Sequence, residues 1–173
     1  MRTKNTRARR VCVVVCTAPL LVLGSAVTAS SALAAAPAAS VVLAPQASTP
    51  GEILTLVNAE RDKAGCEPLK VDPRLAQAAQ AHADDMAANQ ITDHTGSDGS
   101  TYLVRMERAG YSPNGPSSEN VSGPGYADSK AHVDGWMASD RGHRAAILNC
   151  TYKETGIGTS GDYAVELFAV SAR

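Results

Sequence analysis

The sequence lacks a strongly apolar stretch long enough for a comfortable membrane span, which needs about 20 residues. Its apolar run from Val11 to about Leu23 is shorter than that. Five basic residues and no acid precede this run, and small residues that include Ala32-Leu33-Ala34 follow it. A basic head, an apolar middle and a small-residue end are the parts of a secretory signal peptide. We therefore predict that residues 1–34 are a cleaved signal peptide and that the protein is secreted and extracellular. An uncleaved N-terminal anchor is the alternative.

A surplus of positive charge is also missing. The whole chain has 16 basic and 17 acidic residues, and loss of the five basic residues of the signal peptide leaves 11 basic and 17 acidic residues, a net charge of −6 with His neutral. Nucleic acids and anionic lipids bind basic surfaces. Aromatic residues are few, and none of them clusters with basic residues. We therefore expect no nucleic acid as a partner and, given the short apolar run, no stable membrane insertion.

Cysteine is scarce, with four in the chain, and Cys12 and Cys16 lie in the predicted signal peptide. Cys66 and Cys150 remain, and export would place them where disulfides form and persist. They allow a single intrachain pair, which would close a long loop and stabilise the fold by roughly 4–5 kcal/mol at most. Two free thiols are the alternative. A catalytic cysteine is disfavoured, because no His lies beside either one in sequence.

The sequence contains no internal repeat. Residues 35–48 are mostly Ala, Pro, Ser and Val, and we expect them to be a disordered linker. Residues 49–173 are then about the right number for one domain, which we expect to be a monomer.

Capping residues and apolar spacing predict helices in the first two thirds of this domain. Thr49-Pro50 and Asp72-Pro73 each combine an N-cap residue with a proline at the first helical position. The expected helices cover about residues 49–64, 72–86, 100–109 and 127–138, with a short helical turn at 144–149. His82 lies on the apolar stripe of the second helix, so we expect it in the core. We expect His132 on the surface of the fourth helix, and Trp136 and Met137 in the core.

The end of the chain has a different pattern. Residues 155–159 and 163–170 are β-type segments joined by Gly161-Asp162, which is a hairpin signal. Asn120-Val121 is a candidate further strand. Helices followed by a hairpin predict an α+β fold in which helices pack on a small antiparallel sheet.

A series of short motifs then resembles a known family. They are, in order, Leu56-Val57-Asn58 with Arg61; Ala64-Gly65-Cys66; residues 75–86; His94-Thr95-Gly96-Ser97-Asp98-Gly99; Glu119-Asn120-Val121; Trp136-Met137-Ala138-Ser139; and Gly142-His143-Arg144 before Ile147-Leu148-Asn149-Cys150. Their order and spacing resemble the bacterial branch of the CAP superfamily, whose SCP-like extracellular domain occurs in cysteine-rich secretory proteins, insect venom antigen 5 proteins and plant pathogenesis-related proteins. The resemblance covers about residues 52–170.

This resemblance implies a three-layer α-β-α sandwich, an extracellular location and an open cleft that holds two His and two Glu in many members. His94 matches the first His of that set, Glu119 the first Glu and His143 the second His. In animal and plant members the second Glu follows a Trp by three residues, and here Ser139 stands at that spacing from Trp136. The resemblance therefore implies a cleft formed by His94, Glu119, His143 and Ser139.

Two neutral imidazoles and a carboxylate can form the ligand set of zinc, with an open position for a water molecule. His94, His143 and Glu119 are thus candidate metal ligands. Alternatively, the two histidines hold the metal while Glu119 takes a proton from that water. In a purely structural interpretation, His94 fixes its own loop, Glu119 accepts backbone hydrogen bonds and His143 supports the end of the fourth helix.

These observations lead to three hypotheses about function. We expect a secreted, non-catalytic binding module whose cleft holds a lipid, cell-wall or protein ligand. The family's set of two His and two Glu is incomplete here, because Ser139 stands in place of the second Glu, and no nucleophile motif is present. A zinc-dependent hydrolase or peptidase that uses the same cleft is the alternative. A stress or spore-coat structural protein is disfavoured, since the sequence contains no coat-like repeat.

Overall fold

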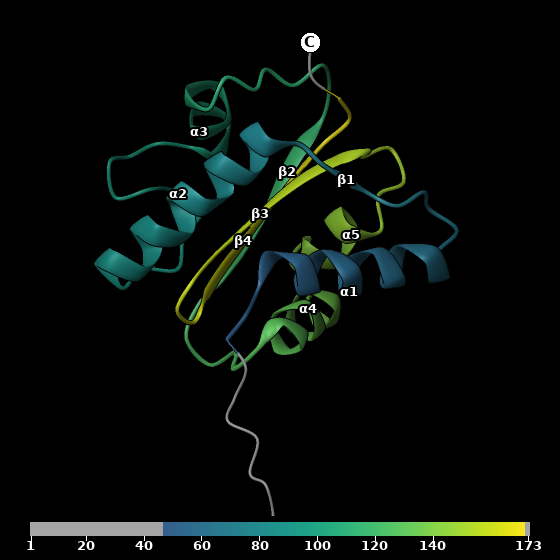
Figure 1. The fold of residues 1–173 in the computed structure, drawn as a ribbon, viewed down its shortest axis with the longest axis horizontal. Helices are drawn as coiled ribbons and strands as arrows, with labels where there is room; N and C mark the ends of the chain where they lie inside the picture. The colour runs from purple at the N-terminus through teal and green to yellow at the C-terminus, as the bar shows by residue number, and fades with distance from the viewer. Residues whose placement is uncertain (1–46, 172–173) are drawn as a thin grey trace, which may run out of the picture. The chain divides into compact units, whose positions relative to one another are not determined.

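A computed structural model describes residues 47–171, so the predicted signal peptide and nearly all of the predicted linker lie outside the described residues. Residues 47–171 form five helices and four strands (Figure 1). The helices are α1 (Pro50–Lys63), α2 (Pro73–Asn89), α3 (Tyr102–Arg108), α4 (Ser129–Ala138) and α5 (His143–Ile147). The strands are β1 (Lys70–Val71), β2 (Ser117–Ser122), β3 (Glu154–Ser160) and β4 (Tyr163–Ala169). No helix among the described residues has the length and apolar character needed to cross a membrane.

The strands form one sheet in the order β1-β3-β4-β2. β4 pairs antiparallel with both β3 and β2, and β3 and β4 form the predicted hairpin, with Gly161 at a φ of +56° in its turn. The two-residue β1 pairs parallel with β3 and makes the sheet mixed. β2 begins three residues before the predicted Asn120-Val121 segment.

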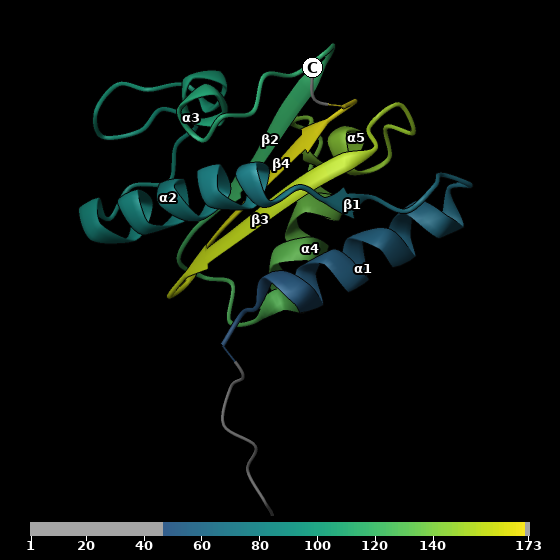
Figure 2. The same ribbon diagram turned by 45° about the horizontal axis from the view of Figure 1, so that its top comes forward.

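The helices cover both faces of the sheet, which confirms the three-layer arrangement (Figures 1 and 2). One face packs against α2, with Leu75, Val165 and Leu167 in a shared apolar cluster. The other face packs against α1, α4 and α5, and its cluster includes Trp136 and Phe168. Alternate side chains of β4 serve the two clusters, as expected for a strand that is buried on both faces.

The first two helices begin where the sequence predicts. The Thr49 hydroxyl accepts a hydrogen bond from the backbone N–H of Glu52 (3.3 Å), and the Asp72 carboxylate accepts one from the backbone N–H of Arg74 (2.8 Å). Each cap satisfies a backbone donor that has no partner within the helix. Local capping chemistry therefore fixes the first residues of α1 and α2.

Two glycines of β3 bring α2 unusually close to the sheet. A Cβ at Gly156 would overlap the backbone of Leu75 and Ala76, and a Cβ at Gly158 would overlap the backbone of Gln80. Helix backbone cannot move away from these points as a flexible side chain could. The absence of a side chain at both positions therefore sets the distance between α2 and β3.

We predict that Gly156→Ala lowers the free energy of unfolding by more than about 3 kcal/mol, because the added methyl group pushes α2 off the sheet. Gly51→Ala is the matched control. Gly51 lies in the first turn of α1 with open space around its Cα, so its replacement should leave stability unchanged or raise it by up to about 1 kcal/mol. Urea unfolding of both variants measures the difference, and equal stabilities would contradict the close-contact explanation.

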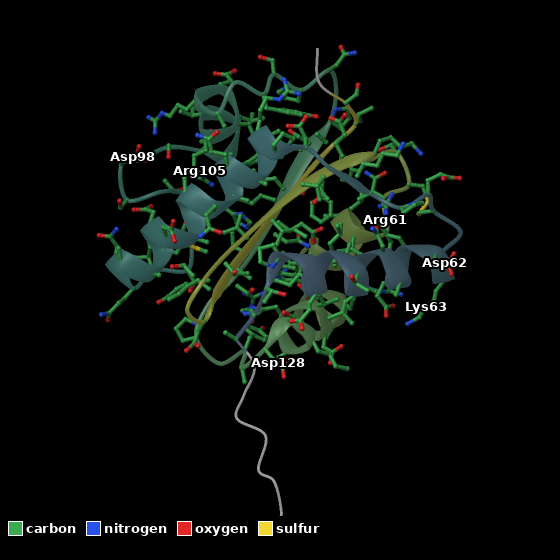
Figure 3. The ribbon with its side chains drawn as sticks, viewed as in Figure 1. Arg61, Asp62, Lys63, Asp98, Arg105 and Asp128 are labelled. Atoms are coloured by element: carbon green, nitrogen blue, oxygen red, sulfur yellow. A yellow bond between two sulfur atoms is a disulfide. The ribbon has the colours of Figure 1, made fainter. Side chains whose placement is uncertain are left out.

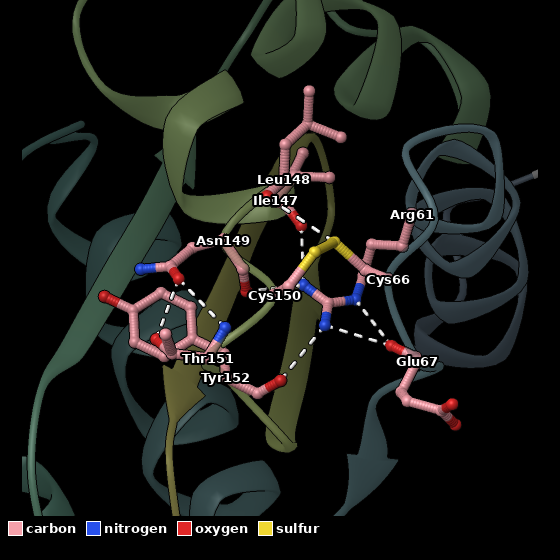
Figure 4. The surroundings of a disulfide bond; sticks show 9 residues. All are labelled: Arg61, Cys66, Glu67, Ile147, Leu148, Asn149, Cys150, Thr151 and Tyr152. Atoms are coloured by element: carbon pink, nitrogen blue, oxygen red, sulfur yellow. Dashed lines mark hydrogen bonds between the residues drawn. A yellow bond between two sulfur atoms is a disulfide. The ribbon is translucent and has the colours of Figure 1, made fainter.

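On the sheet face opposite α2, a disulfide and a buried arginine connect the end of α1 to the segment that follows α5. Cys66 and Cys150 form the expected disulfide across 84 residues of sequence. Beside it, the fully buried guanidinium of Arg61 donates hydrogen bonds to backbone carbonyls on both sides of the bridge (Figure 4). These acceptors are the carbonyls of Glu67 (3.0 Å), Ile147 (2.7 Å), Asn149 (3.0 Å) and Tyr152 (3.0 Å). Arg61 therefore fixes residues 147–152, the segment that follows α5.

One of the four histidines lies in a different environment from the predicted one. His82 is fully buried, as predicted, and its Nε2 lies 2.9 Å from the carbonyl oxygen of Asp93. His132 was expected on the surface, but it is fully buried, and its Nδ1 lies 2.7 Å from the Ser122 hydroxyl. Its ring also packs against Trp136, at 6.3 Å between ring centroids. His132 lies four residues before Trp136, on the same side of α4, so helical spacing was consistent with an inward position. Its polar partner comes from β2 and could not be identified from the helix.

Glu166 is an acid in the middle of the sheet. It is fully buried on β4, and burial raises the pKa of its carboxyl to about 8 against the smaller opposing effects of the Thr155 hydrogen bond and the Arg61 charge. Its Oε1 accepts a hydrogen bond from the Thr155 hydroxyl (3.2 Å). Within residues 47–171, its Oε2 has no partner, and neither has Oδ1 of Asn120, the residue directly opposite on β2. When Glu166 is protonated, its buried negative charge is lost. The carboxyl O–H then provides a hydrogen-bond donor beside Oε2 of Glu166 and Oδ1 of Asn120, which otherwise have none.

The protonation of Glu166 should make stability depend on pH. Its pKa in the folded protein lies above the ordinary value of 4.5, so folding takes up a proton and stability falls as the pH rises from about 4.5 to about 8. Glu166→Gln keeps a neutral donor and should be more stable than the parent at pH 8, by at least about 1 kcal/mol, with a smaller difference at pH 4. Urea unfolding at several pH values measures this, with the exposed Glu107→Gln as control. A gap that does not change with pH would contradict the assignment.

Candidate binding cleft

Three of the predicted site residues face one cavity. His94 comes from the loop after α2, Glu119 from β2 and His143 from the first position of α5. Together they line a cavity of about 270 Å³. The remaining lining residues are Tyr102, Ser118, Arg141 and Gly142. The fold thus unites side chains that are far apart along the chain.

Glu119 is the buried centre of this group, and its side chain is only 1% exposed. Its Oε1 lies 2.9 Å from Nδ1 of His94, and its Oε2 lies 2.7 Å from a terminal guanidinium nitrogen of Arg105. The carboxylate accepts from both, which places the His94 proton on Nδ1 in this pair. Both carboxylate oxygens therefore have a partner within the protein.

Arg105 extends from α3 to join the carboxylate to the loop that carries His94. Figure 3 shows it beside α2. Its guanidinium donates to the backbone carbonyls of Ser100 (2.7 Å) and His94 (3.0 Å), in addition to Glu119. An arginine can make all these bonds at once because its donors point in fixed directions. Arg105 therefore positions both members of the His94–Glu119 pair.

His143 approaches the cavity from the other side. Gly142 has a φ of +101°, a left-handed conformation that turns the chain into α5. The side-chain amide of Asn120 then donates to the carbonyl of His143 (3.2 Å), which connects α5 to β2 next to Glu119. The rings of His94 and His143 lie 6.3 Å apart between centroids, tilted by 51°.

The two histidines have opposite electrostatic environments. The hydrogen bond to Glu119 raises the pKa of His94 above its ordinary value, against a smaller lowering by burial. Burial lowers the pKa of His143, and the nearby charges of His94 and Arg141 lower it further. His94 is therefore the more readily protonated of the pair.

We predict that His94 titrates above the ordinary histidine pKa of about 6.5 and His143 below it, when the ring resonances are followed by NMR. Glu119→Gln should lower the His94 midpoint, because an amide oxygen carries no negative charge to stabilise the imidazolium. Arg144→Gln changes an exposed charge outside the cavity and serves as the control. A His94 midpoint that does not respond to the loss of the Glu119 charge would refute the assigned pair.

Ser139 does not join the other three predicted residues. It is the C-cap residue of α4, and its hydroxyl accepts a hydrogen bond from the backbone N–H of Arg141 (3.1 Å). It is absent from the lining of the cavity. At this position the chain therefore has a local turn contact and no fourth cavity group.

The arrangement does not fit a three-ligand metal centre. Among residues 47–171, no three His, Cys, Asp or Glu side chains are placed to hold a metal ion. Both oxygens of Glu119 are engaged, and Nδ1 of His94 points at one of them. The remaining nitrogens of two imidazoles are fewer than the three or four protein ligands of ordinary zinc sites.

Sequence reasoning missed Arg105 and Arg141, which carry much of the charge around the cavity. Arg105 and Arg108 lie on the same short helix, and no feature of the sequence around them indicates that Arg105 is buried and Arg108 is exposed. Arg108 pairs with Asp98 at 2.6 Å on the surface. Only the tertiary position of β2 identifies Arg105 as the partner of Glu119.

A family model described as "Cysteine-rich secretory protein family" (CAP) matches residues 54–171. Two Bacillus subtilis proteins are similar in sequence. "Uncharacterized membrane protein YlbC" is 32% identical over 123 residues, which are 71% of this chain and 35% of the relative. "Uncharacterized protein YkwD" is 33% identical over 107 residues, which are 62% of this chain and 40% of the relative. The chain thus spans well under half the length of these relatives.

Solved structures share the fold. A Bacillus anthracis extracellular protein containing an SCP domain superposes with a TM-score of 0.65 at 26% identity, over 69% of this chain and 39% of that one. A Staphylococcus aureus cysteine-rich secretory protein superposes with a TM-score of 0.59 at 22% identity, over 70% of this chain and 39% of that one. An outer surface protein of Borrelia burgdorferi has a TM-score of 0.59 at 21% identity, over 69% of this chain and 90% of that one.

Proposed function

Because the chain belongs to the cysteine-rich secretory protein (CAP) family, we propose that it is a secreted binding module whose His94/Glu119/His143 cavity holds a ligand without transforming it. The ligand class is a lipid, a cell-wall component or a protein segment. Similarity to a protein described as extracellular supports secretion. The cavity is small, at about 270 Å³, so it would hold one group of a larger ligand.

One observation carries this proposal: both oxygens of the buried Glu119 are already hydrogen-bonded, to His94 and to Arg105. A general base needs a lone pair within reach of the proton that it removes. Each oxygen of Glu119 keeps a second lone pair, but the two bonds hold the carboxylate between His94 and Arg105, and with its side chain only 1% exposed little of it can meet the proton of a substrate. Its geometry suits the fixed orientation of His94 better than proton transfer.

A metal-dependent hydrolase or peptidase is the alternative, and the approach of two imidazoles to one cavity favours it. His94 and His143 would be the metal ligands, with Glu119 orienting His94 from behind, an arrangement common in metal sites. The engaged carboxylate leaves this ligand set incomplete, so we derive no hydrolytic step from it.

The mature protein should therefore show no turnover of peptide, ester, glycoside or phosphoester substrates, with or without added zinc. It should also retain far less than one equivalent of zinc after dialysis, because two imidazoles are too few to hold the ion tightly. Substrate assays and elemental analysis test these two expectations. Zinc-dependent turnover that His143→Ala abolishes and the neighbouring surface change Arg144→Ala preserves would establish the alternative.

A further inference from the structure

The cavity contains positive charge that no acid among residues 47–171 neutralises. Its single carboxylate, Glu119, is shared between His94 and Arg105. Arg141 also lines the cavity, and its guanidinium has no ion pair or hydrogen bond to any other residue in the stretch 47–171. The cavity therefore has a cation whose donors are free of partners in the described part of the chain.

The charged groups of a second cavity differ in this respect. A second cavity, of about 330 Å³, lies between α2 and α3 and is lined by Asp98 and Arg108, which pair with each other at 2.6 Å. Arg74 pairs with Asp72 at 2.7 Å. In the second cavity, the charges thus satisfy one another, whereas Arg141 is left to a partner from outside.

The charges around His143 also indicate that the cavity is positive. The charges that lower the pKa of His143 are that of Arg141 and, when it is protonated, that of His94. The mature chain carries excess negative charge overall, so this cavity is a local positive region. A region of low dielectric lined by one sign of charge attracts ligands of the opposite sign.

Among the lining residues, Arg141 is the donor best suited to a small oxyanion. Ser118 also lines the cavity, but its side chain is hydrogen-bonded to Tyr152. An arginine can donate two parallel N–H bonds to a carboxylate or a phosphate. The volume of about 270 Å³ would admit such a head group but not a long chain.

We infer that this cavity binds the oxyanionic group of its ligand, a carboxylate or a phosphate, with the Arg141 guanidinium as the principal binding group. The inference rests on the proposed binding function and adds the chemistry of the bound group. His94 and His143 flank the anion, while Glu119 stays bound to Arg105 and does not compete for Arg141.

NMR titration of the isotopically labelled mature protein tests the inference, with sodium acetate, inorganic phosphate and neutral acetamide as probes at constant ionic strength. Acetate or phosphate should shift the ring resonances of His94 and His143 saturably, and acetamide should not. The relative affinities of acetate and phosphate distinguish a carboxylate from a phosphate ligand. Increasing sodium chloride should weaken the interaction, because it is electrostatic.

Arg141→Gln should weaken binding of the preferred anion about tenfold or more, since it removes charged hydrogen bonds. Arg144→Gln, which removes an exposed arginine three residues away and outside the cavity, should leave binding unchanged. Arg141→Lys should bind with intermediate affinity, because it keeps the charge and loses the paired donors.

No saturable shift with either anion, or equal weakening by the Arg141 and Arg144 changes, would overturn the inference. Acetamide binding that Arg141→Gln leaves intact would also overturn it, while the proposal of a binding cavity would survive. Zinc-dependent turnover has a different readout and bears on the proposed function alone.

Discussion

The backbone contact between α2 and β3 is the constraint on which one half of the molecule depends. Because Gly156 and Gly158 carry no side chains, α2 lies directly on the sheet. The chain leaves α2 through Gln90, at a left-handed φ of 54°, and reaches His94 four residues later. If α2 stood further from β3, this loop would lift away from β2. The distance between His94 and Glu119 therefore depends on the α2–β3 contact as well as on Arg105, which is hydrogen-bonded to both residues.

The other half of the molecule depends on a polar anchor. Arg61 supplies buried donors to carbonyls that precede and follow Cys150, so residues 147–152 need no regular secondary structure of their own to be held in place. This segment continues α5, whose first residue is His143. Buried carbonyls without donors would cost about 1–3 kcal/mol each, so one arginine removes several penalties at once. The cavity is thus positioned by glycine contacts on one face and by Arg61 on the other.

Local signals in the sequence predicted the elements but not the polar contacts between them. Caps at Thr49 and Asp72 and the Gly161-Asp162 turn act over a few residues, so they can be recognised without the fold. β1 was missed because two residues are too few to show a pattern. His132 was placed wrongly because its polar character was given more weight than its spacing of four residues from Trp136, and its partner, Ser122, lies on another element. His94, Glu119 and His143 were proposed from a family resemblance alone, and the buried roles of Arg61 and Arg105 depend on partners that only tertiary structure brings near.

The His94–Glu119–Arg105 network matters more for the orientation of His94 than for the stability of the fold. Desolvation of a buried ion pair offsets most of its attraction, so such pairs add little net stability. Their hydrogen bonds are directional, however, and here they fix the orientation of an imidazole ring and of the loop that carries it. Among residues 47–171, Glu119 forms ion pairs with His94 and Arg105 and none with Arg141. Glu119 is thus hydrogen-bonded within the protein, whereas the Arg141 guanidinium is available to a ligand. This arrangement favours recognition of an anion over proton transfer.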